Sequence, residues 1–266
     1  MKIENYKKSK NRNGVVNYEF SELKKLKTNK EPMDYYKTRI QNPYGRDFLN
    51  RSIILNFSEG KTHGCRFNCN YCHWKDNPLT KQRLYPSDEA INEFLDGFKG
   101  NCVTLSGGGD PLYNFKKNKN ELVSLINKIN ERGFLVEIMT KEFENAIKFE
   151  QEKLVSKWSF SSQTMNELLL NVIERVNLCR VTCVYDENTM DTQFLNDYIS
   201  YYKCANKIVI REDLKKNQFD DNDLFINIIN NLWDENRDRV RILRNHDTIN
   251  SHLFLIGDTI TNVLEF

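Results

Sequence analysis

Apolar runs typical of β-strands recur along the chain and are separated by segments in which apolar residues have helical spacing. The strand-like runs are residues 52–57, 102–105, 134–139, 155–160, 179–184, 207–210 and 240–243. The helical segments begin at Ser87 and lie near residues 120–131, 142–150, 164–175, 189–203 and 221–233. Strands that alternate with helices imply a mostly parallel sheet with right-handed crossovers. The pattern therefore predicts an α/β fold, either an open sheet or a complete or partial barrel with helices outside.

Individual residues predict where several of these helices and strands begin or end. Ser87 precedes two acidic residues and an apolar helical pattern, so it is predicted to cap a helix N-terminus. Gly133 follows a helical segment directly and is predicted to end that helix. Residues 251–266 carry alternating apolar residues around Gly257 and Asp258, which predicts a closing β-hairpin. In folds of this class, ligands collect at the C-terminal ends of the strands.

The first fifty residues differ from the rest in charge and periodicity. Residues 1–50 hold 12 basic and 6 acidic side chains, so the net charge of this segment is +6. The net charge of the whole chain is +2, so the remainder has a net charge of −4. With Pro32, Pro43 and weak periodicity, it is predicted to be a basic extension with a short helix over 21–27. Residues 51–266 are predicted to be the core domain with its C-terminal hairpin. Six net charges allow contact with nucleic acid, but a solvated extension is the commoner state of such a run.

Composition places the chain among folded proteins. Of 266 residues, 39% are hydrophobic and 29% charged, which excludes disordered and fibrous classes. No apolar run approaches the roughly 18 residues needed to cross a bilayer, so we expect neither a membrane span nor a secretory signal. We therefore expect a cytoplasmic protein without a membrane partner, in which the seven cysteines are thiols.

Three of the cysteines form a cluster after the first strand-like run. Cys65, Cys69 and Cys72 have a spacing expected only about 0.005 times by chance in a chain of this composition. Soft thiolates select zinc or iron–sulfur clusters. Structural zinc usually takes four protein ligands, whereas a four-iron cluster held by three cysteines leaves one iron for an exogenous ligand. The set therefore favours the cluster, and zinc with His63 or His73 as fourth ligand is the alternative.

With these residues the chain resembles the radical S-adenosylmethionine (radical SAM) superfamily over roughly residues 52–211. Tyr71 fills the aromatic position of its cysteine signature. The family's glycine-rich stretch that ends in an acid is matched by Gly107, Gly108, Gly109 and Asp110, with one additional glycine and with aspartate in place of glutamate. The resemblance implies a partial (β/α)6 barrel in which these residues bind SAM. Glycines let backbone carbonyls approach a ligand, and an acid offsets an amino group.

Further contacts with SAM are implied by the same resemblance. They are Thr140 after the third strand, Ser159 after the fourth and Arg211 at the end of the sixth. The implied cofactors are one 4Fe-4S cluster and SAM. The implied reaction is reductive cleavage of SAM, followed by abstraction of a hydrogen atom from a substrate. The implied electron donor is a protein such as flavodoxin or ferredoxin.

The substrate is left open by the sequence. Tyr71, Cys72 and His73, without further cluster cysteines, are similar to the glycyl-radical-enzyme activases. A 7-carboxy-7-deazaguanine synthase-like enzyme and a peptide-modifying enzyme are the alternatives. The alternative from another class is a zinc-stabilised nucleic-acid-binding module. The other four cysteines, Cys102, Cys179, Cys183 and Cys204, are predicted to be buried core residues, so no second cluster is expected.

Overall fold

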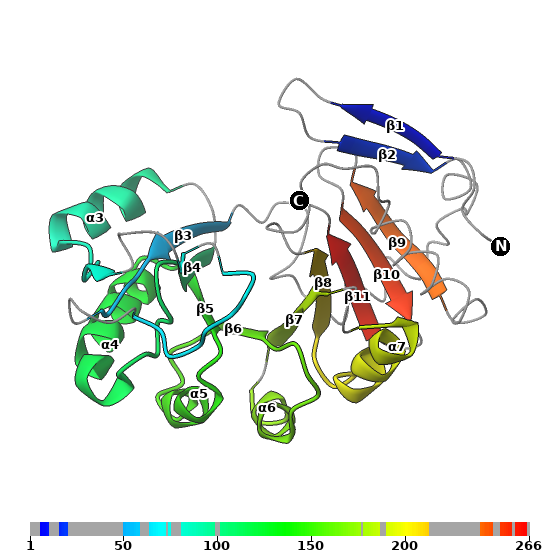
Figure 1. Cartoon of the computed structure of the whole chain (residues 1–266). Coiled ribbons are helices and arrows are strands. Elements are labelled where there is room, and N and C mark those ends of the chain that lie inside the picture. The colour runs from blue at the N-terminus through cyan, green and yellow to red at the C-terminus, as the bar shows by residue number, and fades with distance from the viewer. Residues whose placement is uncertain are drawn as a thin grey trace. The chain divides into compact units, whose positions relative to one another are not determined.

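The structure is a computed structural model, and its contacts divide the chain into two compact units (Figure 1). The cysteine unit comprises Pro43–Ser161 and Asn166–Cys179. The second unit comprises Met1–Asn42, Ser162–Met165 and Arg180–Phe266. The residues that the structure describes are 6–10, 16–20, 50–58, 64–72, 74–75, 81–98, 102–176, 178–186, 190–212, 240–246, 251–256 and 259–264.

Four parallel strands form the sheet of the cysteine unit. Their order is β3, β4, β5, β6, and each pairs in parallel with the next. The strands are β3 (Asn50–Ile54), β4 (Cys102–Ser106), β5 (Leu135–Thr140) and β6 (Lys157–Ser161). Helices follow them in the chain: α3 (Asp88–Gly97), α4 (Phe115–Glu131), α5 (Phe143–Glu150) and α6 (Glu167–Ile173). The β/α succession therefore brings the C-terminal ends of β3 to β6 to one edge of this sheet.

The two faces of this sheet differ in polarity because side chains alternate along each strand. Trp158 and Phe160 of β6 are buried and stack on each other, and they meet Phe149 and Phe143 of α5 edge to face. The alternate position Lys157 points the other way and is also buried. The apolar core of this unit thus lies between the sheet and its helices, while buried polar residues occupy the opposite face.

The second unit contains strands of both directions and one helix between β7 and β8. Here β7 (Cys179–Tyr185) and β8 (Lys207–Glu212) are parallel, and β11 (Thr259–Leu264) pairs in parallel with β8. Strand β10 (Ser251–Ile256) pairs in antiparallel direction with β11 on one side and with β9 (Val240–His246) on the other. The other elements that the structure describes in this unit are α7 (Thr192–Tyr201) and the antiparallel pair β1 (Tyr6–Lys10) and β2 (Val16–Phe20).

The predicted α/β fold is confirmed. Strands β3 to β8 alternate with helices α3 to α7, and all pairings given for these strands within either unit are parallel. The sheets are unclosed, since β3 and β9 each pair with one neighbour among the described strands. The C-terminal hairpin is confirmed as β10 and β11. Among the helices that the structure describes, none is long and apolar enough to cross a membrane.

The basic N-terminal segment contains structure that its pattern did not predict, because β1 and β2 pair as a hairpin. The predicted helices over 21–27 and 221–233 lie outside the described residues. The domain boundary between residues 50 and 51, which separates the basic extension from the core domain, stays a prediction.

Three of the four isolated cysteines are buried as predicted. Cys102, Cys179 and Cys183 have exposed fractions of 0%, 1% and 0%. The prediction for Cys204 is wrong, because this residue is exposed. It lies in the turn after α7, beyond the apolar pattern of the helix.

Candidate metal centre

The cysteine loop, residues 64–75 that follow β3, holds Cys65, Cys69 and Cys72 half-buried. A turn joins the last two, since the amide of Cys72 donates to the carbonyl of Cys69 at 3.2 Å. The Cys65 sulfur accepts a hydrogen bond from the amide of Phe67 at 3.4 Å. Burial raises the pKa of the Cys65 thiol to about 12, and the charges of Asp110, Cys69 and Cys72 act in the same direction. The Cys65 thiol thus lies in a buried and negatively charged environment.

The donor set of this loop fits an iron–sulfur cluster. Three thiols from one short segment are the soft ligands that such clusters take, and they leave one iron of four without a protein ligand. Among the described residues, no group of three His, Cys, Asp or Glu side chains could hold a single metal ion. His63 and His73, the zinc ligands of the alternative interpretation, lie outside those residues.

The glycine–acid loop, residues 107–110 after β4, contacts the cysteine loop backbone to backbone. The amide of Asp110 donates to the carbonyl of Gly64 at 2.8 Å. A Cβ atom on Gly109 would lie 2.2 Å from the Gly64 oxygen, and one on Gly107 would lie 2.7 Å from Ile54 Cγ2. Gly107 also has a φ of +116°, which favours glycine. Gly109 therefore permits close packing of the two loops, and Gly107 permits close packing against Ile54 of β3. The sequence did not indicate either role. Gly108 has more room, with the Asn56 Cβ at 3.4 Å.

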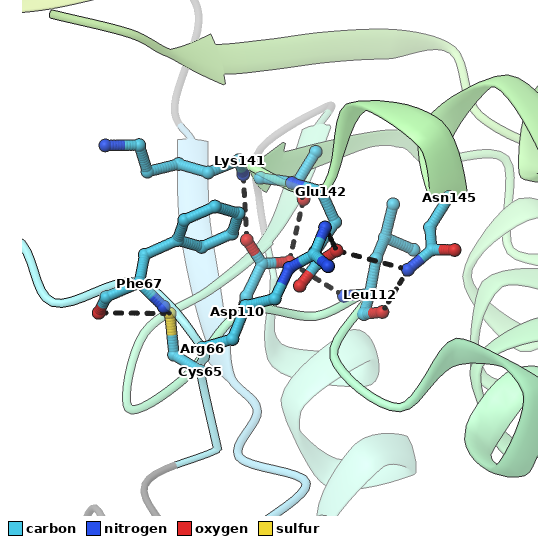
Figure 2. A network of polar contacts seen from close by, with 9 residues as sticks. Cys65, Arg66, Phe67, Asp110, Leu112, Lys141, Glu142 and Asn145 are labelled. Atoms are coloured by element: carbon cyan, nitrogen blue, oxygen red, sulfur yellow. Dashed lines mark hydrogen bonds and ion pairs between the residues drawn. The ribbon is translucent and has the colours of Figure 1, made fainter.

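Asp110 is buried and accepts hydrogen bonds from three donors (Figure 2). Its Oδ1 accepts from the amide of Leu112 at 2.9 Å and from the hydroxyl of Thr140 at 2.7 Å. Its Oδ2 accepts from the amide of Lys141 at 2.8 Å. Burial raises the pKa of this carboxyl, and these hydrogen bonds oppose the rise. Asp110 thus ties the glycine–acid loop to the C-terminal end of β5.

An ion pair joins the cysteine loop to the residue after Lys141. Arg66 lies 2.7 Å from Glu142, whose side chain is 3% exposed (Figure 2). Burial and the negative charge of Asp110 raise the pKa of the Glu142 carboxyl, while Arg66 lowers it. Asn145 of α5 donates to the same carboxylate at 3.3 Å. The guanidinium of Arg66 is thereby paired beside Cys65.

Lys141 reaches the cysteine loop with its side chain. The ammonium nitrogen lies 3.3 Å from the Cys69 sulfur and 3.1 Å from the Tyr71 hydroxyl. The Tyr71 hydroxyl is 3.4 Å from that of Ser161, at the end of β6. Burial opposes the charge of Lys141, but Tyr71 and Cys69 together raise its pKa above the ordinary value. Burial also raises the pKa of Tyr71, against the effect of Lys141.

Most of the residues predicted for this site lie in one network. Those linked by the contacts above are Cys65, Cys69, Cys72, Tyr71, Gly109, Asp110 and Thr140.

Two predicted residues lie within strands. Ser159 is 2% exposed and lies inside β6, not after it as predicted, because the strand extends to Ser161. Arg211 lies in β8 of the second unit, and its side chain is outside the described part of the chain.

The sequence interpretation missed several residues of the network. Among them are Arg66, Lys141, Glu142 and Ser161. Lys141 and Glu142 directly follow Thr140 at the C-terminal end of β5, and Ser161 ends β6. Position at a strand end was thus the signal that could have identified three of them.

The sequence also matches a known family. The model of a family described as a 4Fe-4S single cluster domain matches residues 61–197, just over half of the chain. The chain belongs to this family. As a 4Fe-4S single cluster domain it contains the cysteine loop, the glycine–acid loop and the end of β5 within the matched residues. The prediction of an iron–sulfur protein is therefore confirmed at the level of the family.

The solved structures that match this chain include two crystal structures of SuiB from Streptococcus suis. In one, SuiB is bound to the precursor peptide SuiA; it is 14% identical, has a TM-score of 0.45, and the match covers 70% of this chain and 43% of SuiB. The other is 13% identical, has a TM-score of 0.46, and the match covers 71% and 45%. This 4Fe-4S single cluster domain thus spans less than half the length of the structures it matches. A comparison with curated proteins finds no match.

Proposed function

We propose that this chain is a radical SAM enzyme in which Cys65, Cys69 and Cys72 hold one 4Fe-4S cluster and SAM binds beside it. The observation that carries the proposal is the 2.8 Å hydrogen bond from the amide of Asp110 to the carbonyl of Gly64. It joins the glycine–acid loop to the cysteine loop beyond β3 and β4, which are neighbouring parallel strands. Ligands of α/β proteins bind at such strand ends.

The cluster supplies the difficult chemistry. Held by Cys65, Cys69 and Cys72, a 4Fe-4S cluster with one iron that lacks a protein ligand would supply the reductive cleavage of SAM. The reductant would be a protein such as flavodoxin or ferredoxin, and the products would be 5′-deoxyadenosine and a substrate that has lost a hydrogen atom.

This chain's own residues hold and orient the reactants. Asp110 and Thr140 fix the glycine–acid loop against the end of β5 through the 2.7 Å hydrogen bond between their side chains. Tyr71 is held between Lys141 and Ser161, which fixes its ring within the cysteine loop. The SAM contacts in this proposal are those implied by the resemblance: Tyr71, Gly107, Gly108, Gly109, Asp110, Thr140, Ser159 and Arg211.

Anaerobic reconstitution tests the proposal. The purified protein should take up about four iron and four sulfide ions per chain and turn brown. With SAM and dithionite it should form 5′-deoxyadenosine. Cys69→Ala should abolish this product, whereas Cys204→Ala should retain it, because Cys204 is exposed and lies outside the cysteine loop.

Two results would contradict the proposal in different ways. Colourless protein with one zinc ion per chain would favour the zinc-stabilised module. Iron-loaded protein that forms no 5′-deoxyadenosine would keep the chain in its iron–sulfur family and reject the reaction with SAM.

A further inference from the structure

Lys141 contacts three residues of the cysteine loop with one ammonium group. Its Nζ donates to the Cys69 sulfur at 3.3 Å and to the Tyr71 hydroxyl at 3.1 Å. The same nitrogen lies 5.7 Å from the centre of the Phe67 ring and 5.5 Å from the centre of the Tyr71 ring. Both separations allow a cation–π attraction. The ammonium is thus held at Cys69 by contacts of several kinds.

The main chain of Lys141 is fixed as well. Its amide donates to Oδ2 of Asp110 at 2.8 Å (Figure 2). The amide of Asp110 in turn donates to the carbonyl of Gly64. Lys141 therefore bridges the glycine–acid loop and the cysteine loop. Because the main-chain amide and the ammonium group of Lys141 are both held, its side chain loses little further conformational entropy in keeping its contact with the Cys69 sulfur.

Arg66, a cation of the cysteine loop itself, has a different partner from Lys141. It is paired with Glu142 at 2.7 Å, so the carboxylate offsets its charge. The ammonium of Lys141 instead donates directly to a cysteine sulfur. The two cations are thus expected to affect the thiols unequally.

We propose that Lys141 is a positioning residue that raises the reduction potential of the cluster through its hydrogen bond to Cys69. This inference rests on the proposed placement of the cluster on Cys65, Cys69 and Cys72. A reduced cluster carries one more negative charge than an oxidised one, and part of that charge lies on the ligand sulfurs. A cation that donates to such a sulfur stabilises the reduced form more, and half-buried surroundings strengthen the effect.

The test is a redox titration of the reconstituted cluster without SAM, followed optically and by electron paramagnetic resonance. In Lys141→Met, the ratio of reduced to oxidised cluster at a fixed potential should fall about tenfold, a shift of about 59 mV to more negative potential for one electron. Lys141→Arg should keep most of the wild-type potential, because the charge and an N–H donor remain. A merely structural residue would show no such dependence on charge.

Lys128→Met is the matched control. Lys128 lies in the last turn of α4, at the edge of the sheet where strands begin, and pairs with Asp88 of α3. Its removal takes away the same charge and should leave the potential unchanged.

The outcomes separate this inference from the proposed function. If Lys141→Met holds a full cluster with the wild-type potential, the inference is wrong and the cluster site stands. If the wild-type protein binds no iron, the proposed function itself fails. If Lys141→Met does not load, Lys141→Gln replaces it in the titration: a potential below that of the wild type supports the role of the charge, and an equal potential contradicts it.

Discussion

Gly109 lies so close to Gly64 that a Cβ atom on Gly109 would be 2.2 Å from the carbonyl oxygen of Gly64. A Cβ atom on Gly64 would in turn meet the side-chain oxygen of Asn56 at 1.7 Å. The contact is therefore made by backbone, and both positions require glycine. It joins the two loops on which the proposed function depends.

Gly109→Ala should separate the two loops. The methyl group would press on a backbone oxygen, which cannot turn away as a flexible side chain can. We expect a loss of about 1–3 kcal/mol in the free energy of unfolding, and iron uptake below that of the wild type. Urea unfolding and iron analysis of the reconstituted protein measure the two effects.

Gly97→Ala is the control for this change. No atom lies within 4 Å of a Cβ built on Gly97, the last residue of α3. Stability should be unchanged or higher by up to about 1 kcal/mol, since alanine favours helix. Equal behaviour of the two variants would show that the close contact between the loops is not needed.

Thr140→Val should weaken the attachment of the glycine–acid loop to β5. The variant keeps the shape of the side chain but loses the hydroxyl that donates to Asp110 at 2.7 Å and accepts from the amide of Glu142 at 2.9 Å. We expect a cost of about 1.5–3 kcal/mol, because one partner is a buried carboxylate. Chemical unfolding provides the measurement, and Thr140→Ser, which retains the hydroxyl, should be closer to the wild type. A valine variant as stable as the serine variant would refute this account of Asp110.

Removal of one partner of the buried ion pair between Glu137 and Lys157 should strongly destabilise the cysteine unit. The two groups are 3.0 Å apart with side chains 0% and 2% exposed, and Thr104 also donates to Glu137. Lys157→Met should cost about 3–5 kcal/mol by leaving a buried carboxylate unpaired. The double variant with Glu137→Leu should regain much of that loss.

An exposed lysine provides the comparison for the ion pair. Lys153 pairs with Glu150 at 3.2 Å, but its side chain is 67% exposed. Lys153→Met should change stability by less than about 1 kcal/mol. Similar losses of unfolding free energy for Lys153→Met and Lys157→Met in denaturant would contradict the claim that burial of the ion pair determines the cost.

The chain should hold a single cluster. Cys179 and Cys183 share the four-residue spacing of Cys65 and Cys69, but they are 1% and 0% exposed in β7. Cys183→Ala should therefore retain the iron content of the wild type, at some cost in stability from the cavity. Loss of about half of the iron in this variant would indicate a second cluster.

Local features of the fold could be predicted because neighbouring residues determine them. Ser87 accepts a hydrogen bond from the amide of Ala90, as its position before two acids indicated. Gly133 ends α4 with a φ of +79°, a conformation that glycine adopts without strain. The pair β1 and β2 was missed because the lysine-rich segment YKKSK has no apolar alternation.

The candidate site could be predicted only in part, because its network joins distant residues. The spacing of Cys65, Cys69 and Cys72 is local and was recognisable. The contact between Lys141 and Cys69 spans 72 residues, and no periodic signal encodes it. The ending of β6 at Ser161 was missed for a similar reason, since element boundaries are the least certain part of a pattern.

Electron paramagnetic resonance of the reduced, fully iron-loaded protein tests the central claim most directly. If the three cysteines of the loop leave one iron without a protein ligand, addition of SAM should change the spectrum, because SAM then binds that iron. The same spectrum with and without saturating SAM would contradict the account.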